Sequence, residues 1–257
     1  MVNVVKIGGN IVDNPEALDS FLNDFASLSG PKVLIHGGGK EATRLSKALG
    51  LEARMVEGRR ITDRQTLDVV TMVYAGLINK RIVAMLQARG CNAIGLSGAD
   101  GNTIAATRRP ADPVDFGFVG DLVPTGINVG FLSGLIDQGY TPVLCAICHD
   151  KNGTLLNCNA DSVAGNVARS LAGVMSAAIT FCFEKPGVLA DPDDDSSVIP
   201  VVTGDMFAQM RESGAVAKGM VPKLQNALSC CADGVEHVRI CDAAALLHPD
   251  AGTTVKI

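Results

Sequence analysis

The amino-acid sequence predicts an α/β protein in which helices cover both faces of a largely parallel sheet. Short apolar runs alternate with longer segments that have helical spacing, which is the pattern of consecutive β-α-β units. The chain has 257 residues, 28 of them glycines, and 47% of it is hydrophobic. This composition suits one large domain, or two fused lobes, around a sizeable core.

Each expected element follows from a local pattern. The apolar runs that we expect to form strands are 2–7, 32–36, 92–96, 142–147, 177–183 and 235–240. The segments that we expect to form helices are 15–28, 41–49, 62–89, 161–171, 204–213 and 222–231. Gly50 and Gly90 are expected to end the second and third of these helices. Residues 98–121 are rich in Gly, Asp, Pro and Thr, which predicts short hairpins and loops.

Charge and composition exclude several classes of partner. The formal net charge is −5 and no basic stripe is present, so we expect no nucleic-acid partner. No apolar stretch reaches the roughly 18–20 residues of a membrane span, so we expect no membrane partner. The first residues lack a charged segment followed by a long apolar run, which argues against a signal peptide and predicts a cytoplasmic protein.

The eight cysteines do not indicate a disulfide framework, because no export signal accompanies them. Cys145 and Cys148 have C-x-x-C spacing, but they lie in an apolar run that we expect to be a buried strand. Redox or metal function there is the weaker alternative, because no second cysteine pair or His cluster has ligand spacing. We therefore expect no metal site built by protein side chains.

Three glycine-rich turns follow expected strands, at residues 6–10, 36–40 and 95–101. Ligands of open α/β sheets bind at the carboxyl ends of the strands, and glycines let backbone N–H groups approach an anion closely. The spacing matches neither the P-loop nor the G-x-G-x-x-G dinucleotide pattern. These turns indicate an anion-binding site of another kind.

Polar residues at three places could serve such a site. Lys6 ends the first strand beside a glycine pair, where it could aim at a bound anion or simply face solvent. Asn159 or Asp161 could cap the following helix, or could orient a polar substrate and nearby lysines. Lys223 lies near a helix start, where it could meet a phosphate or remain in solvent. Spacing alone leaves these alternatives open.

Taken together and in order, eight segments make the chain resemble the amino acid kinase superfamily and, within it, the N-acetylglutamate kinases. The matching stretches are 6–9, 33–39, 58–63, 75–80, 95–101, 117–121, 157–161 and 219–223. The Arg-x-Thr stretch at 60–62 and the Asn-x-Asn-Ala-Asp stretch at 157–161 are what separate this family from aspartokinases and carbamate kinases. The resemblance runs over nearly the whole chain.

The resemblance implies a three-layer α-β-α sandwich around a mainly parallel sheet, formed by residues 1–257 as one amino acid kinase domain. It implies an N-terminal lobe, 1–165, that binds an acyl-glutamate and makes dimer contacts. It implies a C-terminal lobe, 166–257, that binds ATP. The cofactor would be ATP with Mg²⁺, and the activity would be transfer of the γ-phosphoryl group to the side-chain carboxylate of an N-acylated L-glutamate. That reaction is an early step of arginine and ornithine biosynthesis.

The resemblance also implies roles for particular residues. Lys6 and Lys223 would stabilise charge on the transferring phosphoryl group, and Asp161 would organise the two lysines. The residues that would bind the acyl-glutamate are Gly38, Gly39, Arg60, Asn157 and Asn159, with Arg60 on the α-carboxylate. The residues that would bind ATP phosphates are Gly8, Gly9, Glu184 and Gly219.

This chemistry needs charge neutralisation and in-line positioning instead of a strong base. A carboxylate is already ionised at pH 7, so lysines, backbone amides and Mg²⁺ supply what the reaction requires. No catalytic histidine is expected, and His36, which precedes a glycine loop, is expected to have a structural role there.

The chain departs from the family pattern at a few positions. Phe183 stands where a hydroxyl residue is common, and Glu184 takes the acidic position beside it. Lys218 stands where glycine or aspartate is commoner, and it could add positive charge near the phosphates. Lys40 and Arg59 are further basic residues beside the substrate motifs. They are either surface charge or a sign that the acyl group carries its own carboxylate, as succinyl does in place of acetyl.

Other readings of the sequence differ in class. A sister kinase acting on aminoadipate, aspartate or carbamate is opposed by Arg60 and the 157–161 segment. A non-catalytic amino-acid sensor on the same fold is opposed by the intact set Lys6, Asp161 and Lys223. An oxidoreductase has the wrong glycine spacing. Arginine-inhibited hexamers of the family carry a helix before the first strand; here that strand begins near residue 2, which predicts an arginine-insensitive homodimer.

Overall fold

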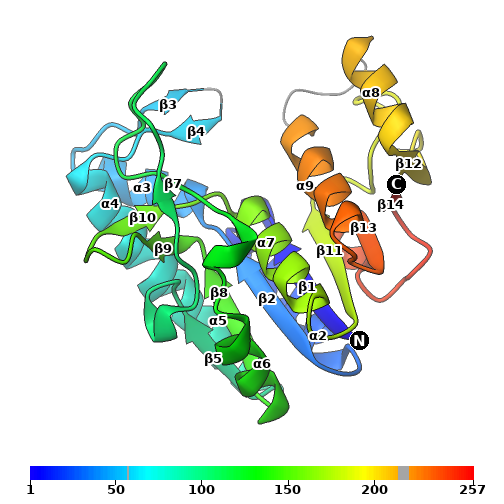
Figure 1. Cartoon of the computed structure of the whole chain (residues 1–257), viewed down its shortest axis with the longest axis horizontal. Coiled ribbons are helices and arrows are strands. Elements are labelled where there is room, and N and C mark those ends of the chain that lie inside the picture. Colours follow the sequence, from blue (N-terminus) through cyan, green and yellow to red (C-terminus); the bar gives the residue numbers. More distant parts are fainter. Residues whose placement is uncertain (57, 214–219) are drawn as a thin grey trace.

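The fold is built on one eight-stranded sheet, in the order β12-β14-β13-β11-β1-β2-β8-β5 (Figure 1). The computed structural model describes residues 1–56, 58–213 and 220–257. The strands are β1 (Val2–Ile7), β2 (Lys32–His36), β5 (Ala93–Leu96), β8 (Thr141–Cys145), β11 (Ala177–Phe183), β12 (Val201–Thr203), β13 (His237–Asp242) and β14 (Thr253–Lys256). All neighbours pair in parallel except β13 and β14, so β14 and β12 run against the other six.

Helices form a layer on each face, as expected for a three-layer sandwich. The helices are α1 (Gly9–Val12), α2 (Pro15–Ser27), α3 (Gly39–Ala48), α4 (Arg64–Thr71), α5 (Asn79–Gln87), α6 (Val129–Asp137), α7 (Ala160–Ala172), α8 (Gly204–Glu212) and α9 (Val221–Ala232). One layer holds α6, α7 and α9, with α7 against β1, β2 and β11; α2 and α5 belong to the other (Figure 1). The predicted fold class is confirmed.

Local chemistry explains why these elements form where they do. The strand β1 is central and almost wholly buried, because its apolar run pairs with β2 on one side and β11 on the other. The helix α2 starts at Pro15 behind an Asn14 cap that accepts from two backbone N–H groups, and it buries Leu18, Phe21, Leu22 and Phe25. The Gly50 that follows α3 has φ +75°, as its position after a helix end predicted.

Several expected bounds needed correction. The helix expected at 62–89 is a run of α4, a π-helical turn η1 (Met72–Ile78) and α5. The strand expected at 142–147 ends at Cys145, and β9 (Ile147–His149) then pairs with β10 (Leu155–Asn157) in a separate ribbon. The elements that the sequence patterns missed include α6, β12, β14 and the hairpin of β3 (Met55–Val56) and β4 (Arg59–Arg60). The hairpin expected within 98–121 is present as β6 (Thr107–Arg108) with β7 (Gly120–Asp121).

The helical run 64–87 has 24 residues and a hydropathy of 1.5, so by length and composition alone it could cross a membrane. The expectation that no stretch is long enough was therefore wrong for this run. In the structure, however, Val70, Val73, Ile82 and Leu86 are buried in the core, and α5 packs against β5 and β8. The buried face of this run therefore forms part of the core.

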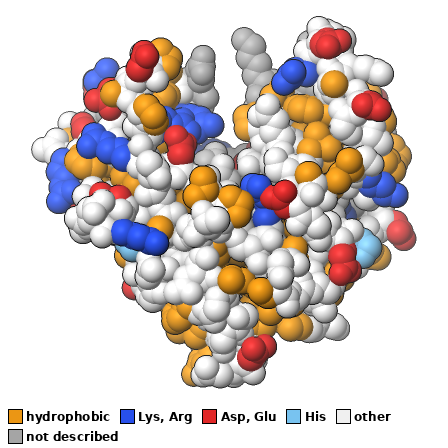
Figure 2. Space-filling model, viewed as in Figure 1, with side chains coloured by type: hydrophobic (Ala, Val, Ile, Leu, Met, Phe, Trp, Pro, Cys, Tyr) orange, Lys and Arg blue, Asp and Glu red, His pale blue; other side chains and the backbone are white. Residues whose placement is uncertain are grey.

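The carboxyl ends of the central strands β1, β2 and β11 meet the amino ends of α3 and α7. We call this place, where the strands end, the sheet edge. This edge lies between the half of the molecule that carries β3, β4 and α4 and the half that carries α8 and α9 (Figure 1). Figure 2 shows the surface hollowed there, with Lys and Arg side chains beside the hollow. The proposed lobe boundary at 165/166 falls inside α7, and the sheet continues across both halves.

Candidate active site

A buried carboxylate joins two lysines at the centre of this edge. Lys6, at the end of β1, places its Nζ 2.7 Å from Asp161 Oδ1. Lys223, near the start of α9, places its Nζ 2.9 Å from Asp161 Oδ2. The Lys6 and Asp161 side chains are only 9% and 10% exposed. Three residues predicted from separate motifs are thus brought together as one ion-pair cluster.

The pKa values of this cluster reflect burial and mutual attraction. Burial acts to raise the pKa of Asp161, but the charges of Lys6 and Lys223 outweigh it and lower that pKa to about 2. Burial lowers the pKa of Lys6 from its ordinary value, and the attraction of Asp161 opposes that shift. Asp161 is therefore fully ionised at neutral pH and holds the two ammonium groups at one place.

The two glycines of the first turn, Gly8 and Gly9, have different backbone roles. The Gly8 N–H donates to the Cys182 carbonyl at 3.0 Å, which extends the pairing of β1 with β11. In this structure the Gly8 N–H is therefore used within the sheet, although Gly8 still lines the phosphate-side cavity described below. Gly9 begins α1, and the first N–H groups of a helix have no acceptor within that helix.

The second glycine turn opens α3. Gly38 is its N-cap and Gly39 its first residue, so their N–H groups have no acceptor within the helix. A Cβ on Gly38 would lie 2.3 Å from Ile78 Cδ1 and 3.1 Å from the Tyr74 ring, so a larger residue would force these side chains to shift. The glycine loop therefore packs against the π-helical turn, and its backbone N–H groups lie at the sheet edge.

Arg60 presents a donor that the described residues leave unpaired. Its Nη2 donates to the Gly39 carbonyl at 2.9 Å and to Thr43 Oγ1 at 2.7 Å. Its Nη1 is buried and has no hydrogen-bond partner among the described residues. An unsatisfied buried guanidinium donor is costly, and a ligand carboxylate would satisfy it.

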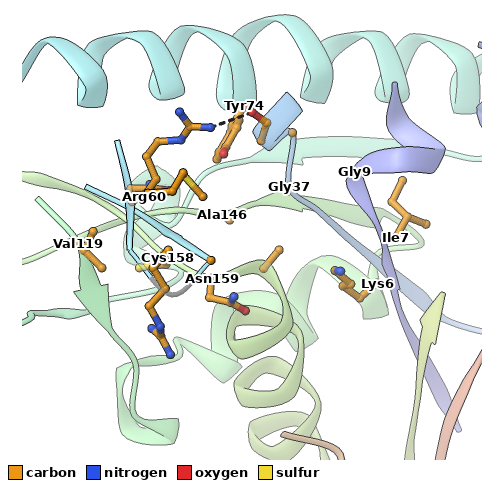
Figure 3. Close-up of a pocket in the computed structure, with 17 residues that line it drawn as sticks. Lys6, Ile7, Gly9, Gly37, Arg60, Tyr74, Val119, Ala146, Cys158 and Asn159 are labelled. Carbon is orange, nitrogen blue, oxygen red and sulfur yellow. Dashed lines mark hydrogen bonds between the residues drawn. The ribbon is translucent and has the colours of Figure 1, made fainter. Parts of the chain in front are cut away.

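Asn157 and Asn159 have different settings. Asn157 is buried, and its Nδ2 donates to Thr62 Oγ1 at 3.0 Å, which joins the two diagnostic motifs. Asn159 caps α7, because its Oδ1 accepts from the Ser162 N–H at 3.0 Å. The capping alternative for Asn159 is thus confirmed, and its side chain also borders the cavity described next (Figure 3).

Two adjoining cavities are lined by residues from both predicted groups. The smaller, about 240 Å³, is lined by Gly38, Gly39, Arg60, Asn157 and Asn159, the expected acyl-glutamate residues. The larger, about 450 Å³, is lined by Gly8, Gly9, Glu184 and Lys223, from the expected phosphate and catalytic residues. Four predicted residues line both cavities: Lys6, Gly9, Gly39 and Arg60. Figure 3 shows Arg60 and Lys6 on opposite sides of the smaller one.

The phosphate-side cavity has its own contacts. Asn10 Nδ2 donates to Glu184 Oε1, which fixes the carboxylate beside the first glycine turn. Lys223 Nζ lies 5.8 Å from the centre of the Phe183 ring, so the aromatic residue faces the lysine that it neighbours. Glu184 is the carboxylate among the described residues of this cavity. Gly219 and Lys218, also expected near the phosphates, lie outside the described residues.

Sequence reasoning missed part of the smaller cavity. Tyr74, Met55, Val119, Ala146 and Cys158 also line it. Val119 and Cys158 lie inside motifs that the sequence singled out, so their position could have been suspected. Tyr74 belongs to the π-helical turn, and no pattern in the sequence signals that turn.

The cysteines do not form a second site within the described part of the chain. All eight are free, and Cys145 and Cys148 are buried on β8 and β9. No group of three His, Cys, Asp or Glu residues that could hold a metal ion occurs among the described residues.

Comparison with known proteins places the chain in a family. The amino acid kinase family profile matches residues 1–242. The chain is 49% identical over 255 residues to an acetylglutamate kinase of Phocaeicola vulgatus, covering 99% of this chain and 98% of the relative. It is 51% identical over 245 residues to that of Cytophaga hutchinsonii, covering 95% and 92%. An N-acetylglutamate synthase structure from Neisseria gonorrhoeae shares the fold, with TM-score 0.84 and 22% identity over all of this chain and 59% of that one. The chain belongs to the amino acid kinase family and, within it, to the acetylglutamate kinases.

Proposed function

We propose that this protein transfers the γ-phosphoryl group of ATP to the side-chain carboxylate of N-acetyl-L-glutamate, an early step of arginine biosynthesis. One observation carries the assignment. A buried, unpaired donor of Arg60 lines the same cavity as the ammonium group of Lys6, which Asp161 holds beside Lys223. A molecule with two carboxylates fits such a cavity, because each end meets a cation.

The reaction exchanges one phosphorus–oxygen bond for another. A side-chain carboxylate oxygen attacks the γ-phosphorus, and the bond from that phosphorus to the β–γ bridging oxygen breaks. The electron pair of the broken bond stays on ADP, and the product is an acyl-glutamyl phosphate. No proton moves, so the protein must position two anions and neutralise them.

The described residues supply that positioning and charge. Lys6 borders both cavities and serves the transferring group, while Lys223 serves the phosphate side. Asp161 organises both lysines and does not act as a base, because it stays ionised between them. Gly9 and Gly39 offer N–H groups to the phosphates and to the reacting carboxylate.

Mg²⁺ would accompany the nucleotide. This ion is usually bound through one or two carboxylates together with substrate phosphates. Glu184 lines the phosphate-side cavity and is not tied to a lysine of the cluster, so it fits that role. The ion would neutralise charge on the phosphates, beside the charge that Lys6 and Lys223 already supply.

The acyl group would lie among apolar side chains of the smaller cavity. Val119, Ala146 and Cys158 line it, which suits the methyl of an acetyl group. N-succinylglutamate is the second candidate substrate, because Arg59 lines the same cavity beside Arg60 and could face a further carboxylate. Lys40 lines the phosphate-side cavity and is less suited to that task.

We further propose that the protein is a homodimer that works in the cytoplasm. Met72 and Leu77 are 53% and 42% exposed on the helical run 64–87, which gives this run an apolar outer surface that a second copy could cover. Eight free cysteines suit a reducing compartment. Light scattering that returns the mass of a single chain would contradict the dimer.

The decisive assay is ADP release with Mg-ATP, run in parallel with N-acetylglutamate and N-succinylglutamate. Turnover should be lost in Lys6→Ala and retained in Lys47→Ala, which changes an exposed lysine of α3. Preference for one substrate names the acyl group. A protein that binds ATP and turns over neither substrate would contradict the kinase and support the sensor.

A further inference from the structure

A buried chain of hydrogen bonds joins the helical run to the second glycine turn. Asn79, the first residue of α5, and His36, the last residue of β2, are both 0% exposed. Asn79 Nδ2 lies 3.1 Å from His36 Nε2, and His36 Nδ1 lies 2.9 Å from the Gly37 carbonyl. Lys80 adds a contact from its Nζ to Asn79 Oδ1 at 3.0 Å. None of these three side chains takes part in the proposed chemistry.

The partners of Asn79 determine which way its amide points. An ammonium group can only donate, so the atom that faces Lys80 Nζ must be the amide oxygen. A carbonyl can only accept, so the atom 2.9 Å from the Val143 carbonyl must be the amide nitrogen. Two independent partners therefore give the same orientation, with Nδ2 toward His36.

The tautomer of His36 follows from that orientation. Since Asn79 Nδ2 donates, His36 Nε2 must accept and carries no proton. The proton of the neutral ring is then on Nδ1, which donates to the Gly37 carbonyl. Burial lowers the pKa of His36 to about 4, so the ring is neutral at pH 7. The other tautomer would set a bare nitrogen against the Gly37 carbonyl oxygen.

The hydrogen bond from His36 holds the Gly37 carbonyl, which directly precedes the N–H groups of Gly38 and Gly39. Gly37, Gly38 and Gly39 all line the smaller cavity. Beneath them, Tyr74 and Ile78 occupy the space that a Gly38 side chain would need. A loop supported from below and tied at the Gly37 carbonyl has little freedom to rotate its next two N–H groups away from the cavity.

The π-helical turn explains how one segment places Tyr74 under Gly38 and also places Asn79 beside His36. Tyr74 is five residues before Asn79, and i→i+5 bonding stacks residues that are five apart. Gly95 leaves room for the assembly, because a Cβ there would lie 2.1 Å from Asn79 Oδ1 and 2.9 Å from Lys80 Nζ. Single π-turns of this kind often mark functional sites.

We propose that His36 is a positioning residue for phosphoryl transfer. Held as the Nδ1–H tautomer by Asn79 and Lys80, it anchors the Gly37 carbonyl and so aims the N–H groups of Gly38 and Gly39 into the cavity. This inference rests on the proposed kinase function. His36 touches neither substrate and acts only through the loop.

Two substitutions separate this role from simple packing. In Asn the amide nitrogen is bonded to Cγ, as Nδ1 is in His; in Gln it lies one bond further out, as Nε2 does. His36→Asn should keep the donor to Gly37, whereas His36→Gln should lose it. We expect His36→Gln to lower kcat about ten- to a hundredfold, the effect of one buried hydrogen bond. His36→Asn should stay within about threefold of wild type.

Thermal unfolding of both variants, with His237→Asn as a matched exposed control, measures the cost in packing. Equal kcat in His36→Gln and His36→Asn would show a packing role and overturn the proposal. The ring tautomer is read without substrate from ¹⁵N chemical shifts at pH 7, and a protonated Nε2 would also overturn it. Absence of wild-type turnover with either acyl-glutamate would instead remove the kinase function, while leaving the tautomer measurement valid.

Discussion

Replacing Asp161 by Asn removes the one carboxylate that pairs with both Lys6 and Lys223. The change keeps the size of the side chain and deletes its charge. Two lysines that were held 2.7 and 2.9 Å from carboxylate oxygens would then face each other without a counter-ion. Because Lys6 is 7% exposed, its ammonium group would be a buried and unpaired charge.

The size of the effect follows from burial and from the pKa of Asp161. The shift from 3.8 to about 2 corresponds to roughly 2 kcal/mol of stability. The folded pKa lies below the unfolded one, so this contribution is present above pH 3.8 and is lost as the pH falls through 2. Loss of a partner from a buried pair costs about 3–5 kcal/mol, because an uncompensated charge remains. We expect Asp161→Asn to lose about 3 kcal/mol at pH 7.

The pH dependence of the stability of Asp161→Asn provides a second test. Without Asp161, burial lowers the pKa of Lys6 further, so the unfolded chain binds a proton that the folded one releases. Stability of the variant should therefore rise between pH 7 and pH 10, more steeply than that of wild type. The turnover number should fall about a hundredfold or more, because both lysines lose their position.

Urea unfolding at several pH values, with ADP release at saturating substrates, measures these effects. The matched control is Asp233→Asn, which removes the exposed partner of Arg169 and should cost less than about 1 kcal/mol. If Asp161→Asn were as stable as this control and showed no added pH dependence, the reasoning about the buried cluster would be refuted.

Three further substitutions test separate parts of the site. Arg60→Lys should raise KM for the acyl-glutamate about tenfold or more, and much more than KM for ATP, because an ammonium cannot reproduce the guanidinium fork; an equal rise for both substrates in steady-state kinetics would contradict the assignment. Gly38→Ala should lower stability in urea unfolding by about 1–3 kcal/mol, since its Cβ would lie 2.3 Å from Ile78 Cδ1; a variant of wild-type stability would show that the loop moves freely. Phe183→Leu should lower kcat about two- to thirtyfold by removing the ring near Lys223, and unchanged kcat would mean that the ring does not position the lysine.

Much of the fold could be predicted because its strong signals are local. The bounds of β1, β2 and β11 agree with the predicted runs residue for residue, since a strand buried on both faces is a continuous apolar run. The strands β12 and β14, at one side of the sheet, were missed because they are short and partly exposed, so their apolar signal is weak. The helix α6 was missed although its sequence is apolar, because Gly130 and Gly134 lie inside it and glycine disfavours a helix.

The membership of the candidate site was also predictable, but the use of each residue was not. Motifs at 6–9, 36–40 and 157–161 named residues that do line two adjoining cavities. That Gly8 had already given its N–H to Cys182 depends on the pairing of β1 with β11, which no local pattern records. Tyr74 was missed for a related reason, since the π-helical turn that presents it follows the spacing of an ordinary helix in sequence.

The sequence by itself determined the kind of chemistry: glycine turns, lysines and a single carboxylate at strand and helix ends, in the order of an acetylglutamate kinase. The tertiary structure alone decided which hydrogen-bond donors are paired within the protein and which are left for a ligand. Asn157 reaches Thr62 across 95 residues of chain, and Arg60 keeps one buried donor unpaired. Hydrogen bonds and ion pairs depend on distances of a few ångströms between segments remote in sequence, and only the folded chain sets those distances.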